Sequence, residues 1–358
     1  MKHVTVLIVD DSPSTRLLLT HVLELDARIK VIATVNDGQA AVDFINAGSV
    51  RPDVVVMDIH MPRLDGFEAT RRIMETTPLP IVICTATADP QELQVAFRSM
   101  EAGAVACVEK PVGHDHPRFD SIVQNLQQTV RLMAEVVVIR RWARPRTLAR
   151  VPVGVPSADA GVNVPRIVGI GASTGGPPVL QTILSGLTRD FPAPLVIVQH
   201  IARGFLPGMV EWLNQTTGLP VHVAAHGTLA IPGHAYIAPD DFHLAVSSSG
   251  RLLLTHEAAE NGLRPSVSHL FRSLAEKIGE PAVGVLLTGM GRDGAAELKV
   301  MRDRGALTIA QDRDSSVVHG MPGAAIELGA AAQVLSADRI ASALITALDR
   351  KVQQAGGV

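Results

Sequence analysis

The sequence predicts an α/β protein of two domains, each built around a mainly parallel sheet covered by helices. The chain has 358 residues, more than one hydrophobic core usually organises. Hydrophobic residues make up 47% of it but aromatic residues only 3%, so its cores are aliphatic, as in parallel sheets buried on both faces. Short β-branched runs also alternate with helical patterns along most of the chain.

The first domain, residues 1–125, is predicted to be a doubly wound (βα)5 unit. Five apolar runs have the length of buried strands: VTVLIV, VIATV, DVVVMD, PIVICTA and VACVEKP. A helical pattern follows each run, over residues 16–25, 39–47, 66–76, 93–103 and about 116–138. Ligands of such a sheet bind at the carboxyl ends of its strands, so functional side chains are expected there.

Residues 126–163 are predicted to hold the end of the last helix and a linker. The stretch RRWARPRTLARVPVGVPSADAGVNVP is rich in Arg, Pro and Gly and has no sustained period. Its arginines could contact nucleic acid or an acidic membrane surface, but a solvated hinge or an interdomain contact is the favoured interpretation. They are Arg140, Arg141, Arg144, Arg146 and Arg150.

The second domain, residues 164–350, is also predicted to be α/β. Alternation resumes with RIVGIGA, a helix from about Pro178, APLVIVQH, a helix from about Pro207, and VHVA. The segment GHAYIAPDDFHLAVSSSGRLLLTH predicts short strands joined by turns, an antiparallel insertion. A helix over 267–279, the strand AVGVLLTG and a final helix–strand–helix complete a mainly parallel sheet.

Composition excludes several classes of partner. A net charge of −3 gives no overall attraction to nucleic acid or anionic lipid, so we expect neither nucleic-acid binding nor membrane insertion. The N-terminal apolar run is only strand-length and leads directly into two aspartates, which excludes a signal peptide or a membrane span. Cys84 and Cys107 lie in apolar runs without metal-type spacing, as reduced core residues do. We therefore expect a cytoplasmic protein.

Charged side chains gather at the strand ends of the first domain. Asp10 and Asp11 end the first strand, Asp58 the third and Lys110 the fifth, and Thr85 ends the fourth with a hydroxyl. Three close carboxylates repel one another, and a hard cation with oxygen ligands, Mg²⁺ above all, would relieve this and neutralise a phosphoryl group arriving on an Asp. The alternative is that each Asp caps the following helix and Lys110 pairs with one of them, but PRLDG and the proline after the lysine favour the functional site.

On these motifs, residues 1 to about 125 resemble a two-component response-regulator receiver domain. The resemblance implies that Asp58 accepts a phosphoryl group, that Asp10 and Asp11 help to bind the metal, and that Lys110 contacts the phosphoryl group. It also implies that Thr85 is the switch hydroxyl.

The chain departs from the receiver pattern at two points. Cys107 stands three residues before the lysine, where such domains often have a Tyr or Phe that acts as a rotameric switch. The stretch between Thr85 and Lys110 is a few residues longer than is common, so Thr87 is an alternative switch hydroxyl.

The turn VGIGASTGGPP in the second domain allows two interpretations, a phosphate cradle or a turn that presents a nucleophile. A dinucleotide site needs an acidic residue at the end of the next strand, where this chain has His200. His200 suits proton transfer from Ser173, and Asp293 follows a third strand in LLTGMGRDGA. Each residue could merely cap a helix or fill a structural role, but their coincidence at three strand ends favours catalysis. Thr174 is an alternative nucleophile, with Ser173 favoured as the primary hydroxyl.

The motifs IGASTGGP, VIVQH, PGHAYIAPDDFH, RPSVSHLF, LLTGMGRDGA and HGMPGAA resemble the catalytic domain of the chemotaxis protein-glutamate methylesterase/glutamine deamidase (CheB) family. The resemblance implies Ser173 as nucleophile, His200 as base and Asp293 as orienting acid, without a cofactor for ester hydrolysis. Met290 becomes a candidate oxyanion donor through its backbone N–H, with Thr174 beside the nucleophile.

The resemblance implies hydrolysis of glutamyl methyl esters, and deamidation of glutamines, on methyl-accepting chemotaxis receptors. A chemotaxis histidine kinase would then be the phosphodonor, and we expect a monomer. Two hypotheses of other classes compete with this. A receiver tethered to a noncatalytic binding module is disfavoured by the three catalytic-type residues, and a nucleotide-dependent oxidoreductase is disfavoured by His200 where an acid should stand.

Overall fold

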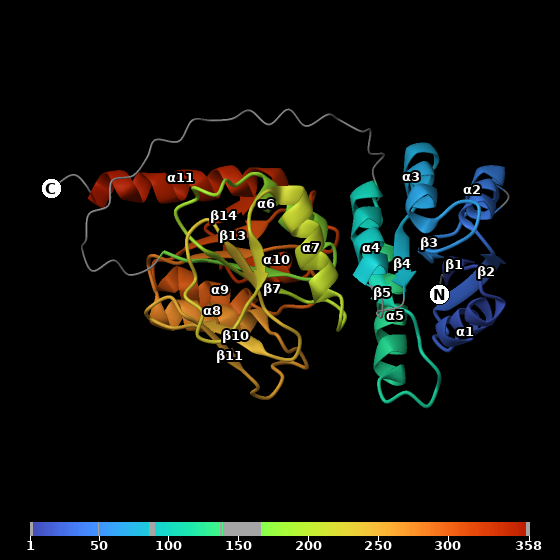
Figure 1. Ribbon diagram of the computed structural model, residues 1–358, viewed down its shortest axis with the longest axis horizontal. Coiled ribbons are helices and arrows are strands. Elements are labelled where there is room, and N and C mark those ends of the chain that lie inside the picture. The colour runs from blue at the N-terminus through green and yellow to red at the C-terminus, as the bar shows by residue number, and fades with distance from the viewer. Residues whose placement is uncertain (1–2, 49, 86–89, 137, 139–165, 356–358) are drawn as a thin grey trace.

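The computed structural model describes residues 3–48, 50–85, 90–136, 138 and 166–355, and it confirms the α/β fold class (Figure 1). The N-terminal domain has a five-stranded parallel sheet in the order β2-β1-β3-β4-β5. Its strands are β1 (Val4–Val9), β2 (Ile29–Val35), β3 (Val54–Met57), β4 (Ile81–Thr85) and β5 (Ala106–Glu109). Its helices are α1 (Pro13–Glu24), α2 (Gly38–Ala47), α3 (Gly66–Thr76), α4 (Pro90–Ala102) and α5 (Phe119–Met133).

The five helices of this domain cover both faces of its sheet. Helix α1 contacts α5, while α3 contacts both α2 and α4. The four residues of β3 are all buried, which explains why they read as one continuous apolar run. Helix α5 is shorter than the predicted 116–138, and the boundary predicted at residue 125 falls inside it. The predicted linker arginines and Thr87 lie outside the described residues.

The C-terminal domain has a seven-stranded sheet in the order β14-β13-β12-β6-β7-β9-β8, in which every neighbouring pair is parallel. Its strands are β6 (Val168–Ala172), β7 (Leu195–Gln199), β8 (Val221–Val223), β9 (Ala235–Ile237), β12 (Val283–Leu286), β13 (Leu307–Gln311) and β14 (Gln333–Leu335). Its helices are α6 (Gly176–Ser185), α7 (Leu206–Thr217), α8 (Val267–Lys277), α9 (Ala295–Asp303), α10 (Met321–Glu327) and α11 (Ala337–Ala355).

Two expectations for this domain need correction. The predicted antiparallel insertion is only the pair β10 (His243–Val246) and β11 (Leu252–Thr255), because β9 instead joins the parallel sheet beside β7. The end of the chain also holds more than one helix–strand–helix, since α10 and β14 come between β13 and α11. Both added elements are short, with seven and three residues, so their patterns are too brief to identify from periodicity.

Strand β6 is the central strand of the larger sheet, and two of its five residues are glycines. A Cβ on Gly169 would lie 2.3 Å from Leu274 Cδ1, and one on Gly171 would lie 2.3 Å from Val267 Cγ1. Helix α8 therefore packs directly on the strand backbone. These two glycines serve helix–sheet packing, which leaves the turn after them free to carry chemistry.

The two domains contact each other through α4, which packs against α7 and α6 (Figure 1). The rings of Phe97 and Trp212 stack with centroids 5.5 Å apart, and both side chains are almost fully buried. Glu101 Oε1 accepts hydrogen bonds from Trp212 Nε1 at 2.9 Å and from Gln181 Nε2 at 2.8 Å. On α5, Gln128 Nε2 lies 3.2 Å from Met290 Sδ.

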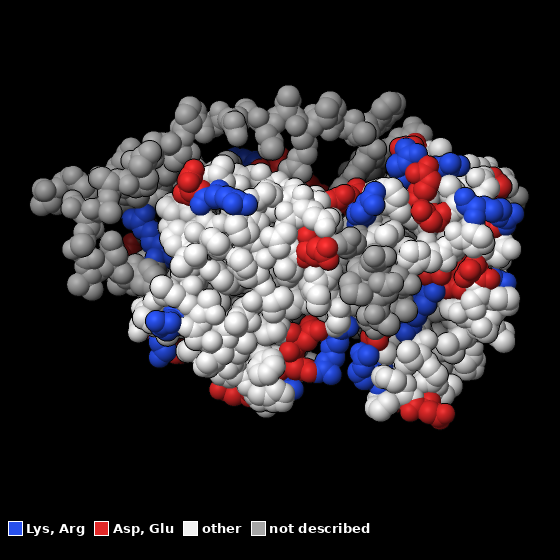
Figure 2. Space-filling model, in the orientation of Figure 1, with Lys and Arg blue, Asp and Glu red and all other residues white. Residues whose placement is uncertain are grey.

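The mixed charges of the surface and the free cysteines match what the composition predicts. On the face shown in Figure 2, acidic and basic side chains are interspersed, and a broad area of the C-terminal domain carries neither. Cys84 and Cys107 are free thiols, and burial raises the pKa of Cys84 to about 12. In the described part of the chain, no helix is both long enough and apolar enough to cross a membrane.

Candidate active site and phosphoryl-acceptor site

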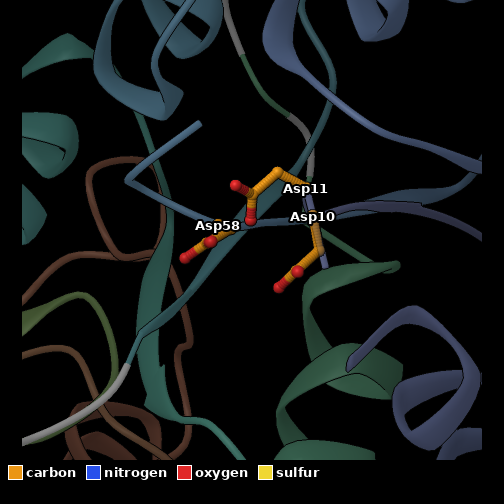
Figure 3. Close-up of side chains that lie close together, drawn as sticks. All are labelled: Asp10, Asp11 and Asp58. Atoms are coloured by element: carbon orange, nitrogen blue, oxygen red, sulfur yellow. The ribbon is translucent and has the colours of Figure 1, made fainter. Parts of the chain in front are cut away.

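Three carboxyl groups meet at the carboxyl edge of the smaller sheet (Figure 3). Strands β1 and β3 pair in register with Val9 opposite Met57, so Asp10 and Asp58 follow neighbouring strand ends. Asp10 is fully buried, Asp58 is buried and Asp11 is exposed. One ligand oxygen from each of the three lies within 4.8 Å of the others, so the predicted residues do come together.

Lys110 lies between the two buried carboxylates. Its Nζ is 2.8 Å from Asp58 Oδ1 and 2.9 Å from Asp10 Oδ2. Burial is the larger influence on Asp58 and raises its pKa, Asp10 adds to that rise, and Lys110 opposes it. Burial disfavours the charged form of Lys110, but the two carboxylates outweigh this and raise its pKa. One ammonium group thus faces two buried carboxylates and a third nearby.

These residues fit a hard divalent cation. Carboxylate oxygens are the ligands that Mg²⁺ prefers, and one lysine leaves the cluster with an excess of negative charge. Asp10, Asp11 and Asp58 are the residues that would hold the ion.

The backbone around Asp58 is tightly fixed. Ile59 N–H donates to Asp58 Oδ1 at 2.8 Å, and Gly66 N–H donates to Ile59 O at 2.8 Å. A Cβ on Gly66 would lie 2.0 Å from Asp58 O, so the glycine of PRLDG is needed for this close approach. Thr85 is buried at the end of β4, and its carbonyl accepts from Lys110 N–H at 2.9 Å.

A second set of side chains meets at the carboxyl edge of the larger sheet. Ala172 in β6 lies opposite Gln199 in β7, so Ser173 and His200 follow paired strand residues. His200 Nε2 lies 2.9 Å from Asp293 Oδ2, which is within ion-pair distance. A Cβ on Gly289 would lie 2.6 Å from Ser173 Cβ, so the serine lies against the loop after β12. The structure thus brings all three predicted residues to one edge.

Asp293 is held by the start of α8. It accepts from Ser266 Oγ at 2.8 Å, from Val267 N–H at 2.7 Å and from Ser268 N–H at 3.0 Å. Burial alone would raise the pKa of Asp293, but His200 and the bonds from α8 outweigh it, so this pKa lies well below its usual value. The carboxylate therefore stays ionised beside the imidazole. No sequence pattern assigns a role to Ser266 or Ser268, although both lie in the motif RPSVSHLF.

The backbone of Ser173 is fixed at both ends. Its N–H donates to Thr288 O at 3.0 Å, and its carbonyl accepts from Gly176 N–H at 2.8 Å. Gly175 adopts φ +77°, where a side chain would be strained and would also meet Val317. Because the Ser173 N–H is already used, it is not available to an oxyanion. Among the hydrogen bonds of the described residues, neither Thr174 N–H nor Met290 N–H has an acceptor.

Comparison with known proteins identifies both halves of the chain. Residues 6–118 match the response regulator receiver domain, and residues 168–344 match the family described as CheB methylesterase. A protein-glutamate methylesterase/protein-glutamine glutaminase of Geobacter metallireducens is 54% identical over 95% of this chain and 98% of its own. One from Nitrosospira multiformis is 48% identical over 95% and 96%, and one from Syntrophus aciditrophicus is 48% identical over 96% and 97%.

The chain belongs to the CheB methylesterase family.

The family fixes the class of reaction. The chain is a hydrolase of the protein-glutamate methylesterase/protein-glutamine glutaminase type joined to a receiver domain. The expectation of both activities and of a response regulator is therefore confirmed. The competing hypotheses of a noncatalytic module and of an oxidoreductase are wrong.

An open cleft of about 420 Å³ lies between the two domains of this CheB-family chain, beside the loop that follows His200. It is lined by Arg118 of the receiver and by Arg203, Gly204, Asp240 and Asp241 of the catalytic domain. Arg203 pairs with Asp241, and Gly204 N–H donates to Asp240 Oδ2 at 2.8 Å. Arg118 of the receiver thus lines the space next to the loop that follows His200.

Proposed function

We propose that this methylesterase acts on methyl-accepting chemotaxis receptors and that phosphorylation of Asp58 activates it. One observation carries the catalytic part, the meeting of Ser173, His200 and Asp293 at one sheet edge with the histidine 2.9 Å from the carboxylate. The proposal includes a chemotaxis histidine kinase as phosphodonor, a monomeric enzyme and a cytoplasmic location.

The proposed chemistry is acyl transfer through a serine ester. Ser173 Oγ attacks the γ-carbonyl carbon of a glutamyl methyl ester while His200 takes the hydroxyl proton. The tetrahedral intermediate collapses, the C–O bond to the methoxy group breaks, and His200 returns the proton to release methanol. Water, deprotonated by His200, then hydrolyses the acyl-enzyme to glutamate and free serine. With glutamine the leaving group is ammonia, and the product is again glutamate.

Asp293 and two backbone groups support this sequence. The ionised carboxylate stabilises the imidazolium that forms when His200 takes a proton. Thr174 N–H and Met290 N–H are the proposed donors to the oxyanion, because Ser173 N–H is bonded to Thr288 O. Ester hydrolysis then needs no cofactor.

Phosphorylation is proposed to occur on Asp58. Mg²⁺ held by Asp10, Asp11 and Asp58 would neutralise charge as the phosphodonor approaches. Lys110 Nζ, 2.8 Å from Asp58 Oδ1, is positioned to pair with an oxygen of the arriving phosphoryl group. Thr85, at the end of the neighbouring strand, is the proposed switch hydroxyl.

The two sites are proposed to communicate through docking of the domains. Helix α4 follows β4, the strand that ends at Thr85, and it is also the helix that packs on α7 and α6. On α5, Gln128 reaches Met290, a proposed oxyanion donor. In the docked state the receiver would restrict receptor access to Ser173, and phosphorylation would loosen the contact of α4.

The test is methanol release from membranes that carry methylated chemoreceptors. If docking favours the closed form by about 1–3 kcal/mol, the open fraction is roughly 1–15%, so phosphodonor and Mg²⁺ should raise the rate about five- to a hundredfold. Asp58→Asn should keep only the basal rate. No methanol release would refute the receptor substrate, and a basal rate that phosphodonor and Mg²⁺ leave unchanged would refute control by phosphorylation.

A further inference from the structure

The buried amide of Gln199 bonds to the backbones of both proposed reacting residues. Its Nε2 donates to Ser173 O at 2.9 Å and to His200 O at 2.8 Å. The side chain is 3% exposed and lies at the end of β7, immediately before His200. One nitrogen thus uses both of its hydrogens to join the nucleophile's turn to the base's loop.

With these two bonds, the backbones of Ser173 and His200 are each held by more than one hydrogen bond. His200 N–H donates to Ala172 O at 2.9 Å, so the histidine is held by the β6 backbone on one side and by Gln199 on the other. The Ser173 carbonyl already accepts from Gly176 N–H, and the amide adds a second bond to it. Pairing of β6 and β7 ends with Ala172 and Gln199. Beyond this point the side-chain amide of Gln199 connects the two chain segments.

The buried amide of Gln199 lowers the stability of the fold, which argues against a role in core packing alone. Gln199 Oε1 is buried and has no hydrogen-bond partner among the described residues, and an unpaired buried oxygen lowers stability. A Cβ on Gly176 would lie only 2.1 Å from that oxygen, so the first residue of α6 must be glycine for the amide to fit. Features that lower stability concentrate at functional sites.

The two hydrogen bonds made by Gln199 require a side-chain amide at this position. Two carbonyl oxygens require two donors, which a neutral –NH₂ group supplies from one atom. An ionised carboxylate has no donor and would be repelled by both carbonyls, and a buried ammonium would carry a large desolvation cost.

We propose that Gln199 is a positioning residue that sets the distance between Ser173 and His200. It acts through the two backbones and does not touch the substrate. The inference rests on the proposed roles of Ser173 and His200. Because a displacement of about 1 Å between reacting groups costs on the order of 100-fold in rate, loss of the amide should lower kcat about 10- to 100-fold and leave KM unchanged.

The main variant is Gln199→Met in the full chain, which keeps the length of the side chain and removes both donors. Its control is Thr308→Val. Thr308 is fully buried near the start of β13, at the end of the strand away from the carboxyl edge. Its hydroxyl likewise bonds to two backbone groups, Ala330 O and Ala332 N–H. Both variants should lose thermal stability, but only Gln199→Met should lose kcat. Methanol release is measured well below both melting temperatures, together with the rate at which a fluorophosphonate labels the serine.

The expected result is a kcat about 10- to 100-fold lower for Gln199→Met than for Thr308→Val, with slower labelling and a KM within about twofold of the wild type. Equal kcat values for the two variants, or a loss confined to KM, would overturn the inference. If Gln199→Met does not fold, Gln199→Glu replaces it. The glutamate variant offers at most one donor in place of two, so it is expected to be equally slow at pH 8, and a wild-type kcat there would overturn the inference.

Ser173→Ala, measured in parallel, separates this inference from the proposed function. An active Ser173→Ala would refute the proposed nucleophile and with it the inference about Gln199. An inactive Ser173→Ala beside a fully active Gln199→Met would refute only the positioning role.

Discussion

Removal of the Glu101 carboxylate is expected to activate the unphosphorylated enzyme. One of its oxygens accepts from Trp212 Nε1 at 2.9 Å and from Gln181 Nε2 at 2.8 Å, and both donors belong to the catalytic domain. Glu101 is exposed, so solvent weakens each bond, and each contributes about 0.5–1 kcal/mol to docking. Glu101→Ala therefore weakens docking by about 1–2 kcal/mol. While the open fraction is small, this raises it about five- to thirtyfold.

The assay compares initial methanol-release rates of full-length chains without phosphodonor. Asp43→Ala is the control, because Asp43 is likewise an exposed carboxylate that accepts a side-chain hydrogen bond, from Gln39, but lies on α2, away from the catalytic domain (Figure 1). Glu101→Ala should exceed the control about five- to thirtyfold, and the rates should converge once Asp58 is phosphorylated. A Glu101→Ala rate within twofold of the control would refute the link between this contact and activity.

Three further outcomes are expected. Ser173→Ala should lower methanol release by about 10⁴- to 10⁶-fold while the chain stays folded, and a near-normal rate would shift attention to Thr174. Radiolabel from a small phosphodonor should appear only with Mg²⁺ and should be absent from Asp58→Asn; labelling that persists without metal would contradict the acidic site. Because the pKa of Asp293 is lowered in the folded state, its contribution to stability is complete above about pH 4 and is lost as the pH falls below that value. Urea unfolding between pH 5 and pH 2 should therefore show a steeper loss of stability in the wild type than in Asp293→Asn, and equal slopes would contradict this reading.

The fold class and the residues that meet at the two sheet edges could be predicted from the sequence, because both depend on where the apolar strands end. In a parallel sheet each functional side chain comes just after an apolar run, so Asp58, Ser173 and His200 could be found one at a time and then placed together. In the sequence the glycines of VGIGA look like part of the turn, whereas in the structure Gly169 and Gly171 allow helix α8 to pack closely on β6.

The remaining features depend on contacts between segments far apart in the chain. The bonds from Ser266 to Asp293 and from Gln199 to Ser173 span 27 and 26 residues, and no local period reports them. The contact of Phe97 with Trp212 joins two helices that each look like ordinary amphipathic segments. Short elements such as β14 give no pattern at all, because three residues are fewer than two periods of a strand.

The position of Trp212 gives the domain contact an optical signal. Its indole is 1% exposed and stacked on Phe97 across the two domains. Indole emission moves to longer wavelength when the ring enters water, so separation of α4 from α7 would change the intrinsic fluorescence of the unlabelled chain. The chain has two tryptophans, and a Trp142→Phe background would leave Trp212 as the single emitter. Stopped-flow mixing with a phosphodonor could then time domain separation against methanol release, and so establish which of the two limits how quickly a cell resets its response.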